Sequence, residues 1–200
     1  MSSSPQYLQP YLEAAQRHGA AFRSLLWASP KTQAVRFEAF TRACLLEGQV
    51  LLDVGCGRAD FLDFLLRSNI RPAQYIGLEA ILPLADAAER KGHAIAQIIR
   101  GDFVSHPHLL EQNADAIIFS GSLNTLGTGD FLQTLRTAWN FTRRQLAFNF
   151  LCSPQLAAAA YLVWHSTEDV LEYLTTLNGQ VVTDDQYLEG DCTVVVTKHE

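Results

Sequence analysis

The sequence lacks several features that would assign it to common classes of protein. No uninterrupted apolar run reaches the length needed to span a bilayer, and the polar start, Met1–Pro5, is not followed by the apolar core of a signal peptide. The 15 Lys and Arg residues are scattered and outnumbered by 21 Asp and Glu, so no basic stripe is present for nucleic-acid phosphates. We therefore expect a cytoplasmic protein with no membrane segment and no nucleic-acid partner.

Cysteine and histidine are also too dispersed to build a metal site. The cysteines share no CxxC spacing, and no HxxxH or HExxH arrangement occurs among the 6 histidines. We expect no metal ion, and free thiols as in a reducing compartment. The four cysteines concerned are Cys44, Cys56, Cys152 and Cys192.

Short apolar runs alternate with amphipathic segments along most of the chain. This alternation predicts an α/β domain whose parallel sheet is covered on both faces. Residues 6–47 have helical periodicity, broken at Ser29–Pro30, and predict an N-terminal helical extension that belongs to the same domain as residues 48–200. The expected strands are 50–54, 74–78, 95–99, 114–120 and 145–151, and the expected helices are 59–68, 81–91, 105–112, 129–142 and 154–163.

The last quarter of the chain departs from this rhythm. A capping-box spacing at Ser166–Asp169 predicts a helix that continues to about Leu177. Two extended runs follow, 180–187 and 192–198, with a short connection at 188–191. A connection of that length fits a hairpin, so one late strand is expected to run antiparallel to the others.

The run from Asp53 to Gly57 carries the strongest functional signal. It places an acid at the end of an apolar strand, followed by two glycines that let backbone approach a ligand closely. Such a turn is typical of a site for a nucleoside-bearing cofactor. A nicotinamide fingerprint requires a small residue at the position of Asp60, and a P-loop requires a Lys-Ser/Thr pair, so neither motif is complete.

Three later segments place polar residues at further strand ends. Glu79 ends the second strand, where a carboxylate can accept both hydroxyls of a ribose. Gly101-Asp102-Phe103 follows the third strand. Ser120-Gly121-Ser122-Leu123-Asn124 ends the fourth. Because the carboxyl ends of parallel strands share one edge, we expect these residues to lie near the glycine turn.

Together these motifs resemble the class I S-adenosylmethionine-dependent methyltransferases over roughly residues 25–198. Ala59 stands where glycine is common in the family. The Ser120–Asn124 motif and Phe148-Asn149-Phe150 are most similar to a poorly characterised bacterial branch. The resemblance implies a Rossmann-like, doubly wound seven-stranded sheet of order 3-2-1-4-5-7-6, with strand 7 antiparallel and the N-terminal extension acting as a lid.

The resemblance also implies S-adenosylmethionine as the cofactor, a ribose contact for Glu79, an adenine-amine contact for Asp102 and ring packing for Phe103. In the N-terminal extension, Arg36 would suit a carboxylate of the cofactor or of an acidic substrate. The full set of expected cofactor-binding residues is Arg36, Asp53, Gly55, Cys56, Gly57, Asp60, Glu79, Ala80, Asp102, Phe103, Ser120 and Gly121.

The sequence does not identify the methyl acceptor. A sulfonium methyl is already activated, so transfer requires mainly an acceptor held in line behind it. Asn124 and His165 are candidate catalytic residues, although asparagines also satisfy loop backbone and His165 can be a surface histidine. We expect a small-molecule acceptor. The alternatives are a non-catalytic module that binds S-adenosylmethionine and an NAD(P)-dependent oxidoreductase, and the oligomeric state stays open.

Overall fold

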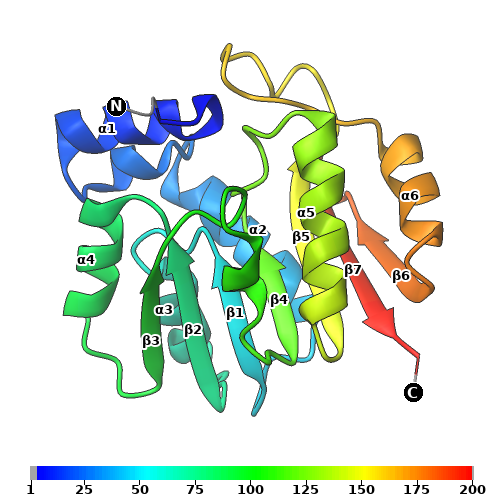
Figure 1. The fold of residues 1–200 in the computed structure, drawn as a ribbon, viewed down its shortest axis with the longest axis horizontal. Helices are drawn as coiled ribbons and strands as arrows, with labels where there is room; N and C mark the ends of the chain where they lie inside the picture. Colours follow the sequence, from blue (N-terminus) through cyan, green and yellow to red (C-terminus); the bar gives the residue numbers. More distant parts are fainter. Residues whose placement is uncertain (1–3, 200) are drawn as a thin grey trace.

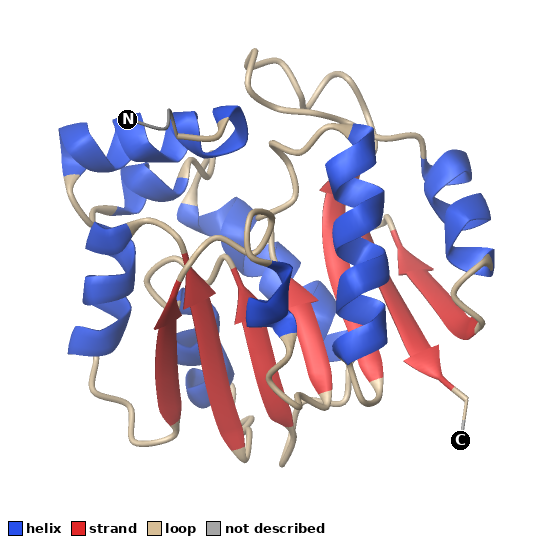
Figure 2. Ribbon diagram, viewed as in Figure 1, coloured by secondary structure: helices blue, strands red, loops and turns tan. Residues whose placement is uncertain are grey.

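The computed structural model describes residues 4–199, which form a seven-stranded sheet with helices on both faces (Figures 1 and 2). The strands are β1 (Val50–Val54), β2 (Gln74–Glu79), β3 (Ala96–Arg100), β4 (Ala116–Phe119), β5 (Gln145–Leu151), β6 (Gly179–Asp184) and β7 (Asp191–Lys198). The α-helices are α1 (Gln9–His18), α2 (Pro30–Ala43), α3 (Asp60–Arg67), α4 (Leu82–Arg90), α5 (Thr128–Phe141) and α6 (Thr167–Thr175). Short 3₁₀ helices are η1 (Gln6–Leu8), η2 (Phe22–Leu25) and η3 (Pro107–Leu110).

The sheet has the predicted strand order, β3-β2-β1-β4-β5-β7-β6, and β7 runs antiparallel to both of its neighbours. In the centre, Leu52 of β1 lies opposite Ile76 of β2 and Ile117 of β4 in parallel register. The carboxyl ends of β1 to β4 therefore meet at one edge, where the arrowheads point in Figure 1. This confirms both the fold class and the edge at which the motifs should gather.

Two apolar layers cover the sheet. On one face, Phe40 of α2 and Phe61 of α3 pack with strand residues, and these helices lie behind the sheet in Figure 1. On the other face, Phe131 of α5 and Leu174 of α6 pack against β4, β5 and β7. The central strands, such as β1 and β4, read as nearly continuous apolar runs because both of their faces are buried.

The first part of the N-terminal extension, from η1 to η2, lies beyond the carboxyl ends of β1 to β3 (Figure 1). Ser29 caps α2 by accepting from the backbone N–H of Thr32, and Pro30 occupies the first helical position, so the predicted break has a clear local cause. Further along, α1 contributes Ala15 to an apolar cluster with Ile81 and Leu84 at the start of α4. The extension is thereby attached directly above the predicted cofactor edge.

Two predicted helices were wrong. Residues 154–163 form turns instead of a helix, and residues 105–112 contain only η3. No residue between 153 and 164 is buried, so a helix there would have no apolar face to stabilise it. The segment instead uses its backbone for tertiary contacts, since Val163 N–H donates to the carbonyl of Asn124. Helix propensity alone does not produce a helix where tertiary packing does not stabilise one.

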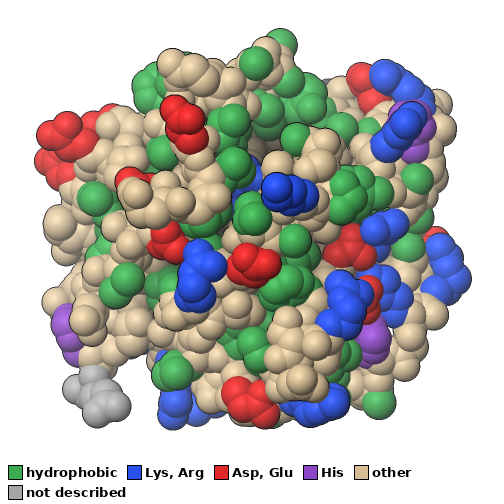
Figure 3. All heavy atoms as spheres, turned by 180° about the vertical axis from the view of Figure 1, so that it is seen from behind, with side chains coloured by type: hydrophobic (Ala, Val, Ile, Leu, Met, Phe, Trp, Pro, Cys, Tyr) green, Lys and Arg blue, Asp and Glu red, His purple; other side chains and the backbone are tan. Residues whose placement is uncertain are grey.

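No helix within residues 4–199 is long and apolar enough to cross a membrane. On the face shown in Figure 3, Lys and Arg side chains lie among acidic, apolar and neutral ones and form no continuous basic stripe.

A buried ion pair joins the N-terminal extension to β7. Nε of Arg36 on α2 donates to Oδ2 of Asp191 at the start of β7, 2.8 Å away, and Asp191 is fully buried. The Tyr187 hydroxyl donates to the other carboxylate oxygen. Arg36 also lies over the ring of Trp27, 4.8 Å from its centroid. Arg36 thus holds α2, Trp27 and β7 together.

Replacing Arg36 with leucine should destabilise the protein by about 3–5 kcal/mol, because it leaves the Asp191 carboxylate buried without its cation. Urea unfolding followed by circular dichroism measures the change. The matched control is Arg42→Leu on the same helix, which breaks the partly exposed pair with Asp184 and should cost less than about 1 kcal/mol. Equal losses in the two variants would contradict a structural role for the Arg36 pair.

Candidate functional site

A cavity of about 640 Å³ opens at the carboxyl edge of the sheet, between the strand ends and the N-terminal extension. Seven of the predicted cofactor-binding residues line it: Gly55, Gly57, Glu79, Ala80, Phe103, Ser120 and Gly121. The structure therefore brings together residues that follow four different strands, as the parallel sheet requires.

Glu79 occupies the centre of this arrangement. Its buried carboxylate accepts from the backbone N–H of Gly57 at 2.7 Å and from that of Ile81 at 2.8 Å. Burial raises the pKa of Glu79, and these backbone hydrogen bonds oppose the rise. The side chain thus fixes the turn after β1 to the start of α4, with its carboxylate in the cavity wall.

The turn after β1 needs its glycines for space and for backbone conformation. Gly55 has φ of 72°, and a Cβ added there would overlap the Cβ of Ser122. Ala59 caps α3 in the left-handed region with φ of 55°, a conformation that costs an alanine roughly 1 kcal/mol. The glycine that is common at this position in the resembled family therefore has a conformational reason.

A smaller adjoining cavity of about 290 Å³ contains three more predicted residues, Asp53, Cys56 and Asp60. Asp53 is buried and accepts a hydrogen bond from the Tyr75 hydroxyl. Burial raises the pKa of Asp53 to about 7; the Tyr75 hydrogen bond opposes this rise, and the nearby charges of Glu79 and Asp60 add to it. The pKa of the Cys56 thiol also rises, chiefly through burial, so the thiol stays protonated.

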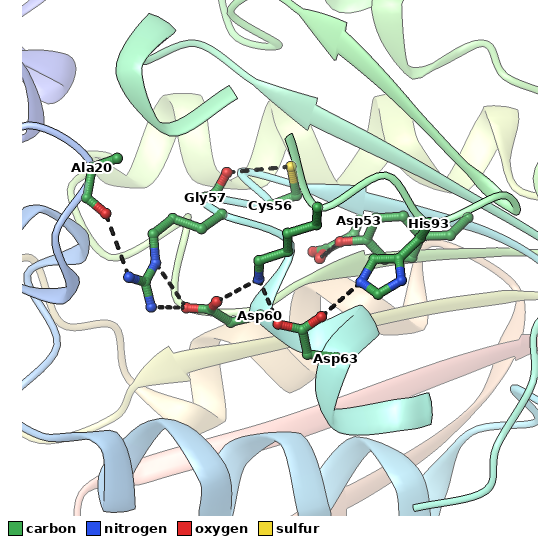
Figure 4. Close-up of polar contacts among 10 residues, drawn as sticks. Ala20, Asp53, Cys56, Gly57, Asp60, Asp63 and His93 are labelled. Carbon is green, nitrogen blue, oxygen red and sulfur yellow. Dashed lines mark hydrogen bonds and ion pairs between the residues drawn. The ribbon is translucent and has the colours of Figure 1, made fainter. Parts of the chain in front are cut away.

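Asp60 lies between two cations, as Figure 4 shows. Its carboxylate is 2.8 Å from Nη2 of Arg58 and 2.8 Å from Nζ of Lys91. Lys91 continues to Asp63, which also contacts His93. Through these contacts Asp60 borders the small cavity while joining α3 to the end of α4.

Asp102 does not line the main cavity, although Phe103 does. The Asp102 carboxylate accepts from the Tyr7 hydroxyl at 2.6 Å, the Ser105 hydroxyl at 2.6 Å and the Val104 backbone N–H at 3.0 Å. Phe103 packs edge-on against Phe119 with centroids 5.6 Å apart. The loop after β3 thereby presents an aromatic ring to the cavity and its acid to the N-terminal extension.

Arg36 is not brought to either cavity. Its guanidinium is committed to Asp191, and it reaches the cavity wall only through Trp27, which lines both cavities. The sequence could not distinguish these partners, because Asp191 lies 155 residues away.

The ends of β4 and β5 carry polar atoms that have no hydrogen-bond partner among the described residues. Gly121 N–H donates to Oδ1 of Asn149 at 2.7 Å. His165 stacks on Phe131 with centroids 4.1 Å apart, and burial lowers the pKa of its imidazole, which is therefore neutral near pH 7. Neither candidate catalytic residue lines the cavities. The unpartnered atoms are Ser120 Oγ, Asn124 Oδ1, Asn149 Nδ2 and His165 Nε2.

A wider cleft adjoins the main cavity and shares Tyr7 and Thr125 with it. Its walls come from η1, α1 and the segment around Tyr161 and Val163. Both cavities therefore depend on the N-terminal extension.

Solved structures that share the fold include two methyltransferases and a protein bound to SAM. The DhpI-SAM-HEP complex has a TM-score of 0.74 at 15% identity and covers 98% of this chain and 99% of that one. The magnesium protoporphyrin IX methyltransferase ChlM from Synechocystis PCC 6803 with bound SAM gives 0.69 at 12% identity, over 100% of each chain. The CcbJ methyltransferase from Streptomyces caelestis gives 0.71 at 12% identity, over 96% and 98%.

The chain has the class I methyltransferase fold. No family model and no curated protein matches its sequence. At these identities the likeness concerns the fold, so the functional argument rests on the site itself.

Sequence reasoning missed much of the cavity wall. The N-terminal extension contributes Tyr7, Leu8, Tyr11, Leu25 and Trp27. These residues lie in short helices and turns with no periodic signal that marks a binding face. The aromatic residues near the start of the chain were the available clue, since amphipathic rings often line ligand pockets.

The raised pKa of Asp53 predicts a pH-dependent stability. An unfolded aspartate titrates near 3.9, so between about pH 4 and pH 7 the folded state binds the extra proton and stability falls as pH rises. Asp53→Asn, which can still accept from Tyr75, should remove this contribution and gain on the order of a few kcal/mol at pH 8. Melting temperatures of both proteins from pH 5 to pH 8 test the slope, and parallel curves would contradict the assignment.

Proposed function

We propose that this protein is an S-adenosylmethionine-dependent methyltransferase acting on a small molecule. The observation that carries the proposal is the buried carboxylate of Glu79, which stands in the cavity wall beside the glycine turn that it fixes. A ribose needs a carboxylate of this kind together with backbone that can approach closely, and Gly55 supplies the space.

We assign the ribose and adenine of the cofactor to the main cavity and its methionine part to the smaller cavity. Glu79 binds the ribose and Phe103 packs on the adenine; Asp102, which lines neither cavity but contacts Tyr7 of the wall, is our candidate for the adenine amine. The smaller cavity is lined by Asp53 and Asp60 but by no Lys or Arg, which favours the positively charged methionine end. The unpartnered Ser120 Oγ at the junction can bind a polar group of the ligand.

When bound, S-adenosylmethionine supplies an activated methyl group, so the protein must chiefly position the acceptor. The wider cleft that shares Tyr7 and Thr125 with the main cavity is the place for that acceptor. His165 follows Val163 of the cleft wall by two residues but is buried and lines none of these cavities, so its neutral imidazole is a candidate base that the acceptor must reach past the cleft wall. Asn124, whose backbone carbonyl accepts from the Val163 N–H, is the second candidate catalytic residue.

S-adenosylmethionine or its demethylated product should raise the melting temperature by roughly 5–10 °C at a hundredfold excess over the dissociation constant. Glu79→Ala should abolish the shift, because it removes the ribose ligand and releases the glycine turn. Where this variant does not fold, calorimetry on Glu79→Gln gives the same test with the side-chain volume kept.

The matched control is Glu89→Ala on α4, which removes an exposed carboxylate paired with Arg100 and should leave the shift intact. A shift with NAD and none with either S-adenosyl compound would replace the proposal with an oxidoreductase. Radiolabelled methyl transfer to a metabolite extract separates an enzyme, which must give a labelled product, from a module that only binds.

A further inference from the structure

The first segment of the N-terminal extension, residues 4–18, is hydrogen-bonded to the fold beyond residue 47 through one side chain. The Tyr7 hydroxyl donates to Oδ2 of Asp102, 95 residues away, at 2.6 Å, and lies 3.1 Å from the Ser105 hydroxyl. Within the described part of the chain, these are the only hydrogen bonds joining residues 4–18 to anything beyond residue 47. Apolar contacts also attach this segment: Ala15 packs with Ile81 and Leu84, and the Tyr7 ring packs against the main core.

The two attachments stand on either side of the nucleoside cavity. Ile81 and Leu84 follow β2, Asp102 follows β3, and the segment between the attachments contributes Tyr7 and Tyr11 to the cavity wall. A segment fixed at both points covers the cavity mouth. Removing the Tyr7 hydroxyl would leave only apolar contacts between this segment and the described residues beyond 47, and these are not directional.

We infer that Tyr7 is a positioning residue that clasps residues 6–18 over the nucleoside end of the cofactor, sharing the Asp102 carboxylate with the adenine amine. The inference rests on the proposed function, since it takes an adenine nucleoside as the occupant. An ionised carboxylate offers about four acceptor sites, and Tyr7, Ser105 and Val104 use three of them. One acceptor site is left on a carboxylate that lies 2.6 Å from the hydroxyl of Tyr7, a residue of the cavity wall, and we assign that site to the adenine amine, so that segment closure and nucleoside binding support each other.

The hydroxyl is suited to this role across the neutral range. Burial raises the pKa of Tyr7 to about 12, and the hydrogen bond to Asp102 adds to the rise. The phenol therefore stays a donor. Were Tyr7 instead a competitor for the adenine amine, its removal would tighten binding, so the sign of the effect separates the two roles.

The test replaces Tyr7 with phenylalanine, which keeps the ring packing and removes only the donor. S-adenosylhomocysteine should bind about tenfold more weakly, mainly through faster dissociation, as expected for a lost charge-assisted hydrogen bond in a closing segment. Calorimetry and stopped-flow displacement measure the two quantities. Tyr173→Phe is the matched control, because it removes a hydroxyl bonded to the Leu132 carbonyl on α5 and should change neither.

Trypsin provides a readout that needs no ligand. Arg17 is an exposed cleavage site in the clasped segment and Arg23 is one shortly after it, and cleavage at Arg17 should be faster in Tyr7→Phe than in Tyr173→Phe or the parent protein. Bound S-adenosylhomocysteine should protect these sites strongly in the parent and weakly in Tyr7→Phe.

The outcomes are distinguishable. If the parent protein does not bind S-adenosylhomocysteine, the proposed function fails and the adenine-sharing inference falls with it, while trypsin still reports whether Tyr7 holds the segment. If the parent binds but Tyr7→Phe binds equally or more tightly, the inference alone is overturned. Unchanged trypsin cleavage in Tyr7→Phe overturns it as well.

Discussion

The candidate site depends on one buried carboxylate and the backbone amides that it binds. Glu79 ends a central strand, and its two oxygens accept from Gly57 and Ile81 in the loops on either side. A buried charge is tolerable only when its hydrogen bonds are satisfied, so this contact fixes both loops relative to the sheet. The glycine turn, the cavity floor and the start of α4, on which the N-terminal extension rests, all follow from it.

The fold and the centre of the site were predictable because, in a parallel sheet, the position of a residue along its strand determines at which edge of the sheet it lies. Asp53 and Glu79 lie at the ends of buried strands and Ser120 follows another, and parallel strands end at one edge. A connection too short for a crossover indicated in the same way that one late strand runs antiparallel. These inferences use local periodicity and connection length, whereas the strand order and the identity of the antiparallel strand came from the resemblance to the methyltransferase family.

The outer parts of the site depend on contacts that no local pattern specifies. Arg36 pairs with Asp191 and Tyr7 with Asp102, across 155 and 95 residues. The residue type of Arg36 suggested a ligand for a carboxylate of the cofactor or substrate. Its carboxylate partner is Asp191 instead, which lies too far along the chain for a local sequence pattern to identify. The expected helix at 154–163 failed for a related reason, because its apolar residues found no surface to pack against.

The distribution of charge around the smaller cavity of the site favours a positively charged ligand group there. Asp53 and Asp60 border it, whereas Arg58 and Lys91, the cations paired with Asp60, are not among the residues that line it. A sulfonium placed beside Asp53 would lower the pKa of that carboxyl from about 7 and favour its ionised form. The demethylated thioether carries no such charge and loses this attraction. Transfer of the methyl group would therefore lower the affinity of the smaller cavity for its ligand. This loss favours exchange of the product for a new cofactor while the contacts at Glu79 stay unchanged.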